Sequence, residues 1–237
     1  MNIALIIAGG KGERTKQDIP KQFLHIENKP LIIYTLESFE THPAIDKILV
    51  VCLEGWHSIL WAYANQYNIS KLQWMVNGGE SGHDSIHNGI MELKKYCTKT
   101  DAILIHDANR GLVSHEIISN GISTYEKYGN AVTVIPCTEV VFRSADGQIA
   151  EEEVPRNVLF RTQTPQIFSL GKLCWAHEEA ERQNITSPLA ACSLMQALGE
   201  PVYFSWGSEK NIKITTTDDI DIFRAMLNLS DNMSLKK

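Results

Sequence analysis

The chain has 237 residues, of which 43% are hydrophobic, and it carries a formal net charge of -6. This length and composition suffice for one sizeable core, and we expect a single α/β domain over residues 1–237. The acidic balance lacks the clustered Lys and Arg that nucleic acid or an acidic membrane surface requires, so neither is an expected partner.

Over the first 136 residues, short apolar runs alternate with longer segments of helical spacing. The runs are rich in Ile, Val and Leu and predict buried strands at Ile3–Ile7, Lys47–Cys52, Leu72–Val76, Ala102–His106 and Ala131–Pro136. The segments between them predict helices at Leu31–Phe39, His57–Gln66, Asp84–Tyr96 and His115–Tyr128. This alternation predicts a Rossmann-like, mostly parallel sheet with helices on both faces.

After Pro136 the alternation stops. Val140–Arg143 and Ile149–Val154 flank Asp146-Gly147, a dipeptide typical of a two-residue hairpin turn, and predict a protruding β-arm over about residues 138–157. After the arm, the sequence predicts two helices at Leu170–Gln183 and Pro188–Leu198, a strand at Val202–Phe204 and a final helix at Asp218–Leu227. The last eight or so residues are expected to fray.

Two further features concern cellular location and redox state. The first 30 residues lack a charged segment followed by a long apolar stretch, and no segment approaches the ~20 apolar residues of a membrane span, so a cytoplasmic protein is expected. The five cysteines are scattered and lack CxxC spacing. They are therefore predicted to be buried free thiols, and neither a disulfide framework nor a zinc site is expected.

A glycine-rich loop, Ala8-Gly9-Gly10-Lys11-Gly12-Glu13-Arg14, directly follows the first predicted strand, and Pro20-Lys21-Gln22-Phe23 comes soon after it. Glycines let backbone N–H groups approach phosphate oxygens, and Arg14 and Lys21 can neutralise a triphosphate and its leaving pyrophosphate. The alternative is a tight turn with two solvated cations. The spacing fits neither GxxxxGK[ST] nor GxGxxG, which disfavours a kinase and a dinucleotide-dependent oxidoreductase.

Five more motifs follow in order: Gly78-Gly79 with Asp84-Ser85, His106-Asp107-Ala108 with Arg110, Val154-Pro155-Arg156, Gln163-Thr164-Pro165-Gln166-Ile167-Phe168, and Asn211-Ile212-Lys213-Ile214-Thr215. With them, nearly the whole chain resembles the polyol-phosphate nucleotidyltransferases, in the branch that contains methylerythritol phosphate and ribitol-5-phosphate cytidylyltransferases. The resemblance implies that a cytidylyl group passes from CTP to a small polyol phosphate with Mg2+ as cofactor. It also implies a homodimer formed through the β-arm.

The resemblance also implies a role for individual residues. Arg14, Lys21 and Lys213 are the predicted catalytic cations, and Arg110, Arg156 and Thr164 are predicted to bind the acceptor. In similar enzymes the arm crosses to a second subunit, where an arginine closes the partner's acceptor pocket. No general base is expected, because the attacking phosphate is already ionised. The predicted nucleotide-binding residues are Ala8, Gly9, Gly10, Gly12, Gly78, Gly79 and Ser85.

Asp107 ends a predicted strand, at the edge where open α/β sheets bind their ligands, and its carboxylate suits Mg2+. The plainer interpretation is that Asp107 caps a helix. The neighbouring His106 closes a buried strand and is interpreted as a structural residue. Lys213 lies in an alternating, strand-like stretch and points either into the cleft or to solvent. For Arg156, the alternative interpretation is that its side chain forms an ion pair on the surface.

Several positions depart from the family pattern. Relatives have arginine where this chain has Gly82, proline where it has Gly111, and methionine where it has Thr15. A Thr-Asp-Asp/Glu-Ala-Ser stretch near the acceptor is replaced by Leu189-Ala190-Ala191-Cys192-Ser193.

The nucleotide half of the pattern is therefore better preserved than the acceptor half. This favours ribitol 5-phosphate or a similar polyol phosphate destined for a surface polysaccharide. Methylerythritol phosphate cytidylyltransferase stays an alternative. A non-catalytic nucleotide-binding relative is another, although the retention of Arg14, Lys21, Asp107 and Lys213 counts against it.

Overall fold

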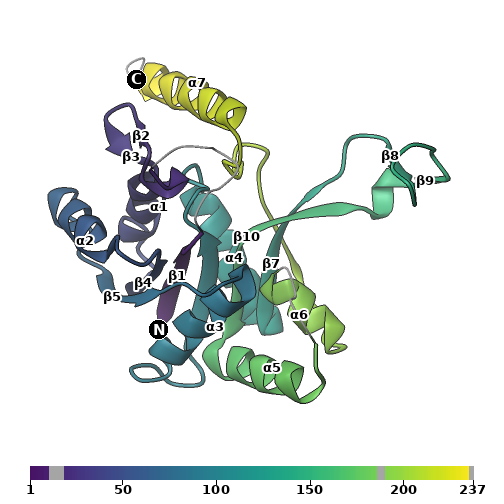
Figure 1. Ribbon diagram of the computed structural model, residues 1–237, viewed down its shortest axis with the longest axis horizontal. Coiled ribbons are helices and arrows are strands. Elements are labelled where there is room, and N and C mark those ends of the chain that lie inside the picture. The colour runs from purple at the N-terminus through teal and green to yellow at the C-terminus, as the bar shows by residue number, and fades with distance from the viewer. Residues whose placement is uncertain (11–18, 186–189, 235–237) are drawn as a thin grey trace.

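The computed structural model describes residues 1–10, 19–185 and 190–234, and for residues 230–234 it describes the backbone alone. A seven-stranded sheet in the order β11-β7-β10-β6-β1-β4-β5 forms the centre of the molecule (Figure 1). Strand β10 runs antiparallel to β6 and β7, and the other neighbouring pairs are parallel. The strands are β1 (Asn2–Ala8), β4 (Lys47–Cys52), β5 (Leu72–Asn77), β6 (Ala102–Asp107), β7 (Asn130–Pro136), β10 (Phe160–Ser169) and β11 (Phe204–Trp206).

Helices cover both faces of the sheet, as the sequence predicts. Helices α1 (Leu31–Glu40), α2 (His57–Gln66) and α4 (His115–Tyr128) pack on one face, and α3 (Gly82–Leu93), α5 (Leu170–Arg182) and α6 (Ala191–Ala197) pack on the other. Alternate side chains of each strand enter the two layers, because successive strand residues point to opposite faces.

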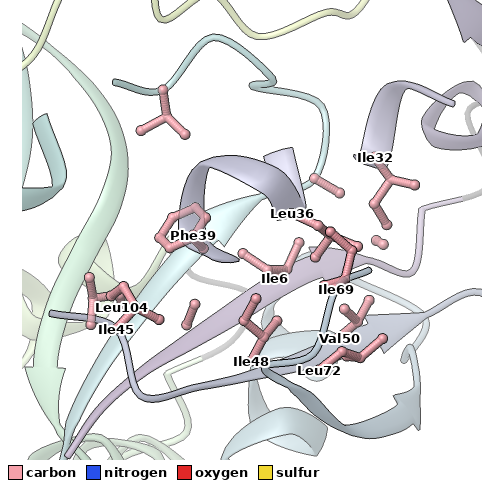
Figure 2. Packing of buried hydrophobic residues seen from close by; sticks show 14 of the residues in the cluster. Ile6, Ile32, Leu36, Phe39, Ile45, Ile48, Val50, Ile69, Leu72 and Leu104 are labelled. Carbon is pink, nitrogen blue, oxygen red and sulfur yellow. The ribbon is translucent and has the colours of Figure 1, made fainter. Parts of the chain in front are cut away.

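Strand β1 illustrates this arrangement. Ala4 and Ile6 join the cluster with α1, whereas Ile3 and Leu5 join the cluster with α3. Figure 2 shows Ile6 close to Leu36 and Val50 in the first cluster. Since both faces of β1 are buried, its sequence is continuously apolar rather than alternating.

A third, smaller cluster attaches the final helix, α7 (Thr217–Ser234), to the body. Phe223 of α7 is fully buried in a cluster with Ile26 and Leu31. Ile26 belongs to the short hairpin of β2 (His25–Ile26) and β3 (Lys29–Pro30), and Leu31 begins α1. A side chain at Gly111 would collide with the Phe223 ring and with Cβ of Tyr34. The close packing of α7 therefore explains glycine at position 111.

The β-arm extends away from the body of the molecule (Figure 1). It pairs β8 (Val141–Arg143) with β9 (Glu152–Val154), but the predicted two-residue turn is wrong, since residues 144–151 form a longer loop between the strands. Asp146 Oδ1 accepts hydrogen bonds from the backbone N–H groups of Gln148 (2.8 Å) and Ile149 (3.0 Å). Asp146-Gly147 thus makes an Asx turn within this loop.

Other predicted boundaries also need correction. The helix predicted at Asp84–Tyr96 begins at Gly82, because Ser81 is its N-cap, and it ends at Leu93. The strand predicted at Val202–Phe204 lies at Phe204–Trp206. The helix predicted at Pro188–Leu198 is α6 and starts at Ala191, and positions 188 and 189 lie outside the described residues.

The predicted C-terminal helix was too short, and three strands, the two-residue β2 and β3 and the longer β10, were not predicted. Helix α7 runs on to Ser234, past its predicted end at Leu227. The expected fraying of the last residues stays a prediction. Strand β10 was not predicted, because its polar run Gln163-Thr164 precedes a proline.

Within residues 1–10, 19–185 and 190–234, no helix is both long and apolar enough to cross a bilayer. All five cysteines are free thiols. Cys52 and Cys192 are buried as predicted, whereas Cys97, Cys137 and Cys174 are partly exposed.

Candidate active site

A cleft opens at the carboxyl ends of the parallel strands β1, β5 and β6. After β1 the chain places β4 on one side of that strand and later β6 on the other, and this reversal creates the crevice in which open α/β sheets bind ligands. Predicted site residues from separate parts of the sequence meet here. Those that line the cleft are Ala8, Gly9, Gly10, Lys21, Gly78, Gly79, Ser85, Asp107, Arg110, Thr164 and Lys213.

Two predicted residues, Gly12 and Arg14, lie outside the described residues. Arg156 is described but does not line the cleft of its own chain. It lies in the short η3 helix (Arg156–Val158) of the arm, where its exposed guanidinium donates to the carbonyl oxygen of Thr138 at 3.1 Å. Its predicted action in a partner's pocket stays a prediction.

The glycine corner of the cleft, which we define as Gly9, Gly10, Gly78 and Gly79, is built by close approach of two turns. A Cβ added at Gly9 would lie 2.9 Å from Cα of Gly78, and the reverse contact is equally short. Only residues without side chains allow the turns after β1 and β5 to meet this closely. The Ser85 hydroxyl accepts a hydrogen bond from the backbone N–H of Gly79 at 3.0 Å and joins α3 to this corner.

Helix α3 begins at the same corner. Ser81 Oγ accepts from the Asp84 N–H at 3.1 Å and Asp84 Oδ2 accepts from the Ser81 N–H at 3.0 Å, which completes a capping box. The free N–H groups and positive dipole end of such a helix start favour an anionic ligand. A side chain at Gly79 would overlap Cβ of Asp84, so glycine is required for the turn to contact the helix start.

Gln22 holds the first turn of the glycine corner through its side-chain amide. Its buried side-chain amide donates to the carbonyl oxygens of Ala8 (2.7 Å) and Gly10 (3.0 Å). These two bonds hold the backbone of residues 8–10 in the curved path that leads into the glycine-rich loop. Gln22 follows Lys21 in the η2 helix (Lys21–Phe23), and the half-buried Lys21 lines the cleft beside the corner.

The opposite side of the cleft is ionic. Asp107 ends β6, and its two oxygens accept from different cations, Oδ1 from Lys213 Nζ and Oδ2 from Arg110 Nε, each at 2.9 Å. Burial raises the pKa of Asp107, but the positive charges of Lys213 and Arg110 outweigh this and hold the pKa below its usual range. The carboxylate is therefore ionised at neutral pH. Asp107 does not cap the next helix, because Ser114 is the N-cap of α4.

Arg110 is held inside this ionic side and is 9% exposed. Besides its bond to Asp107, its Nη1 donates to the carbonyl oxygen of Asn211 at 2.6 Å. The guanidinium thus lines the cleft and also fixes Asp107. Its predicted contact with an acceptor stays a prediction.

His106 is fully buried, and desolvation lowers its pKa to about 4, so the imidazole is neutral at neutral pH. Its Nε2 lies 3.4 Å from the carbonyl oxygen of Arg110, which can only accept, and its Nδ1 lies 2.9 Å from Thr164 Oγ1. Nε2 therefore carries the proton, and Nδ1 accepts from the Thr164 hydroxyl. These bonds agree with the structural role predicted for His106, and they orient Thr164 at the cleft.

Lys213 points into the cleft, but the strand-like segment predicted around it is not a strand. Residues 211–215 have no regular secondary structure. Ile214 is buried, whereas the Lys213 side chain is 44% exposed and turns towards Asp107.

One wall of the cleft is formed by Ala190, Ala191 and Ser193, whose side chains are small and uncharged. The backbone N–H of Cys192 donates to Gln166 Oε1 at 3.0 Å, so this wall is tied to β10. Leu189 lies outside the described residues. At Gly82 no atom lies within 4 Å of an added Cβ, and nothing in the structure explains glycine there.

Sequence reasoning assigned no role to four residues that shape the cleft: Gln22, Asn109, Gln163 and Asn211. Gln22, Gln163 and Asn211 stand inside the PKQF, QTPQIF and NIKIT motifs. Their amides bond mainly to backbone groups of distant segments, and such partners leave no mark in the local sequence.

Among the described residues, no three His, Cys, Asp or Glu side chains are grouped so as to hold a metal ion. Mg2+ commonly binds through one or two carboxylates together with substrate phosphates. Asp107, an ionised carboxylate on the cleft, fits this mode of binding, in which phosphates supply the remaining oxygens.

The family model for 2-C-methyl-D-erythritol 4-phosphate cytidylyltransferase matches residues 2–229. A ribitol-5-phosphate cytidylyltransferase of Lacticaseibacillus paracasei is 42% identical over 96% of this chain and 98% of its own. A 2-C-methyl-D-erythritol 4-phosphate cytidylyltransferase of Clostridium botulinum is 39% identical over 92% and 94%, respectively. A solved structure of 4-diphosphocytidyl-2C-methyl-D-erythritol synthase superposes with a TM-score of 0.79 at 26% identity, covering 95% of this chain and 98% of that one.

Proposed function

Because this chain belongs to the family of 2-C-methyl-D-erythritol 4-phosphate cytidylyltransferases, we propose that it transfers the cytidylyl group of CTP to ribitol 5-phosphate or a similar open-chain polyol phosphate. The general activity, CTP-dependent cytidylyl transfer to a polyol phosphate, is that of the family and of its relatives on both sides of the branch. The observation that carries the proposal is the meeting of the glycine corner, Lys21 and the Asp107–Lys213 pair in one cleft.

The chemistry follows from what these groups can do. A phosphate oxygen of the acceptor attacks the α-phosphorus of CTP, and the bond from that phosphorus to the bridging oxygen breaks as pyrophosphate leaves. The glycine corner and the start of α3 present N–H groups to the nucleotide. Lys21 and Lys213 stabilise the negative charge that spreads over the α-phosphate and the leaving group.

Mg2+ is proposed as the cofactor, with Asp107 as its carboxylate ligand. When bound, the ion would supply positive charge to the triphosphate. Asp107 also holds Lys213 in the cleft, so one carboxylate would bind the ion and position the lysine.

For the acceptor, two observations favour ribitol 5-phosphate. The L. paracasei relative, at 42% identity, bears that name. The wall of Ala190, Ala191 and Ser193 carries no charged side chain where the family pattern leads us to expect an acidic stretch, and this favours an acceptor other than methylerythritol phosphate. The product, a CDP-polyol, is an activated donor suited to surface polysaccharide synthesis.

Methylerythritol phosphate is the second candidate acceptor. It is favoured by the family match over residues 2–229 and by the 39% identity to the C. botulinum enzyme.

A homodimer through the β-arm is part of the proposal. The arm carries exposed apolar side chains at Val140, Phe142, Ile149 and Val158, which a monomer would leave in water. Arg156 lies on the same arm and has no part in the cleft of its own chain. A partner subunit would cover the apolar groups and receive the arginine.

The deciding experiment is pyrophosphate release with Mg2+ from each of the four nucleoside triphosphates. The acceptor panel is ribitol 5-phosphate, methylerythritol 4-phosphate, glycerol 3-phosphate and aldose phosphates. We expect release from CTP with ribitol 5-phosphate and little with the other acceptors. Faster turnover of methylerythritol 4-phosphate would establish the second candidate. CTP binding without release from any acceptor would overturn the proposal.

A further inference from the structure

Residues 207–216, which connect β11 to α7 and carry Lys213, run along the cleft without a helix or a strand. A segment of this kind has no ladder of backbone hydrogen bonds to hold it, so its backbone groups need other partners. The Lys213 side chain is 44% exposed and flexible by nature, and its ammonium can face Asp107 only if the backbone is held in place. The structure supplies the missing partners from side-chain amides.

Asn211 is the first of these anchors and is fully buried. Its Nδ2 donates to Gln163 Oε1 at 3.1 Å and to the carbonyl oxygen of Thr164 at 2.9 Å. Its own carbonyl oxygen accepts from Arg110. One residue therefore connects the Lys213 segment to β10 and to the arginine that grips Asp107.

Gln163 completes the anchor from the β10 side. Its Nε2 donates to the carbonyl oxygen of Ser208 at 2.9 Å, and its Oε1 accepts from the Ser208 N–H at 3.3 Å as well as from Asn211. A side chain at Gly207 would collide with Gln163 Oε1, so the glycine leaves the amide room. Further along, Asn109 exchanges two hydrogen bonds with the backbone of Ile214, one at 3.0 Å and one at 2.5 Å.

The amide of Asn211 acts here through its donor group. Its NH2 group donates to two atoms that can only accept, Gln163 Oε1 and the carbonyl oxygen of Thr164. Asn211 Oδ1 is buried and has no hydrogen-bond partner in the described part of the chain. Since a buried acceptor without a partner is unfavourable, the two donated bonds are what the amide contributes.

We infer that Asn211, together with Gln163, is a positioning residue that holds Lys213 against Asp107 in the place required for cytidylyl transfer. The inference rests on the proposed catalytic role of Lys213. Asn211 itself acts through the backbone two residues before the lysine.

The first test replaces each amide. Asn211→Ala and Gln163→Met, of which the second keeps side-chain length, should each lower kcat by roughly 10- to 100-fold, because a small misplacement of a catalytic group is costly. KM for CTP should change by less than about threefold. Asn130→Ala is the matched control. The Asn130 amide also joins two backbone segments, the Pro201 carbonyl oxygen at 3.0 Å and the Tyr203 N–H at 2.9 Å, but it lies outside the cleft, and kcat should not change.

A double-mutant cycle separates positioning from a merely structural role. In a Lys213→Ala background, Asn211→Ala and Gln163→Met should cause no more than about a twofold further loss of kcat, because the group they position is gone. Single-turnover measurement with labelled CTP keeps the slow variants measurable. Gln163→Met carries the test if Asn211→Ala does not fold.

The outcomes are distinguishable. If the losses multiply in the double variants, or if the single amide variants keep normal kcat, the inference is wrong while the proposed function stands. If Lys213→Ala itself keeps normal kcat, the catalytic role of Lys213 fails and the inference falls with it.

Discussion

The two sides of the cleft are built in different ways. The glycine corner consists of two backbone turns that contact each other because Gly9 and Gly78 lack side chains. Its chief side-chain contact is local, since Ser85 is six residues from Gly79 in the sequence. The ionic side consists of charged and amide side chains from distant segments. Lys213 and Asp107, for example, are 106 residues apart in the chain.

The two sides of the cleft should therefore respond differently to substitution. The glycine corner tolerates no added volume, because its geometry depends on close backbone contact. The ionic side depends on charge, since Asp107 balances two cations in a partly buried place. Substitutions that add volume should therefore act on nucleotide binding, and substitutions that remove charge should act on turnover.

The largest effect is expected for Lys21→Ala, which removes a cation from the glycine side. We expect kcat/KM to fall by about 10³-fold or more, because in the proposed function this charge serves the phosphates in the transition state. The melting temperature should stay close to that of the wild type.

Lys172→Ala is the control for this substitution. Lys172 pairs with Glu200 at 2.8 Å, away from the cleft, and its loss should leave kcat/KM unchanged. A Lys21→Ala enzyme with near-normal turnover on any acceptor would remove Lys21 from the catalytic set.

Asp107→Asn tests the ionic side. It keeps the shape of the side chain but removes the charge that balances Arg110 and Lys213. We expect kcat to fall roughly 10²-fold and the free energy of unfolding to fall by about 2–3 kcal/mol, because the buried guanidinium loses its counter-charge. Steady-state kinetics and urea denaturation measure the two effects.

Glu37→Gln is the matched control for the loss of a carboxylate. Glu37 accepts from Lys29 at 2.9 and 2.8 Å, outside the cleft. Its replacement should leave kcat unchanged. An equal loss of kcat in both variants would show that the Asp107 effect is not specific to the site.

Gly79→Ala tests the glycine corner by volume alone. The added methyl group overlaps Cβ of Asp84 and should push the turn away from α3. We expect KM for CTP to rise about tenfold while kcat falls less, since uniform binding is what the corner provides. Gly82→Ala, where no atom lies within 4 Å of the new group, should change KM far less. Equal KM values in the two variants would contradict the volume argument.

The smallest effect concerns pH and helix α3, which supports the glycine corner. His83 and His87 of α3 face His177 of α5, with ring centroids 4.6 and 5.0 Å from that of His177. Burial, followed by the two neighbouring histidines, lowers the pKa of His177 to about 4. The unfolded chain, with a histidine pKa near 6.5, therefore binds the proton more readily than the folded protein does.

Stability from this group should be fully present above about pH 6.5 and be lost as the pH falls towards 4. Between pH 7 and pH 4, the free energy of unfolding of His177→Leu should therefore fall by on the order of 2 kcal/mol less than that of the wild type. Chemical denaturation at several pH values between 7 and 4 measures the effect. Parallel pH dependences for the wild type and His177→Leu would show that the cluster does not control acid stability.

Much of the fold follows from short-range patterns. The strand Lys47–Cys52 and the helices His57–Gln66 and His115–Tyr128 have the bounds that the periodicity predicts, because the burial of their own side chains decides each of them. The antiparallel strand β10 was missed for the same reason. Its polar residues Gln163 and Thr164 bond to distant segments, and local periodicity carries no sign of those partners.

In the cleft, motif spacing alone predicted the glycine turns, Lys21, Asp107 and the family, because such spacing expresses local backbone requirements. The folded structure adds that Lys213 faces Asp107, that Arg110 bonds to both Asp107 and Asn211, and that Gln163 anchors the segment before the lysine. These contacts escape prediction because the residues are far apart in the chain. Contacts between residues about 50 to 100 positions apart exist only after the sheet has brought the strand ends together, so no local pattern specifies them.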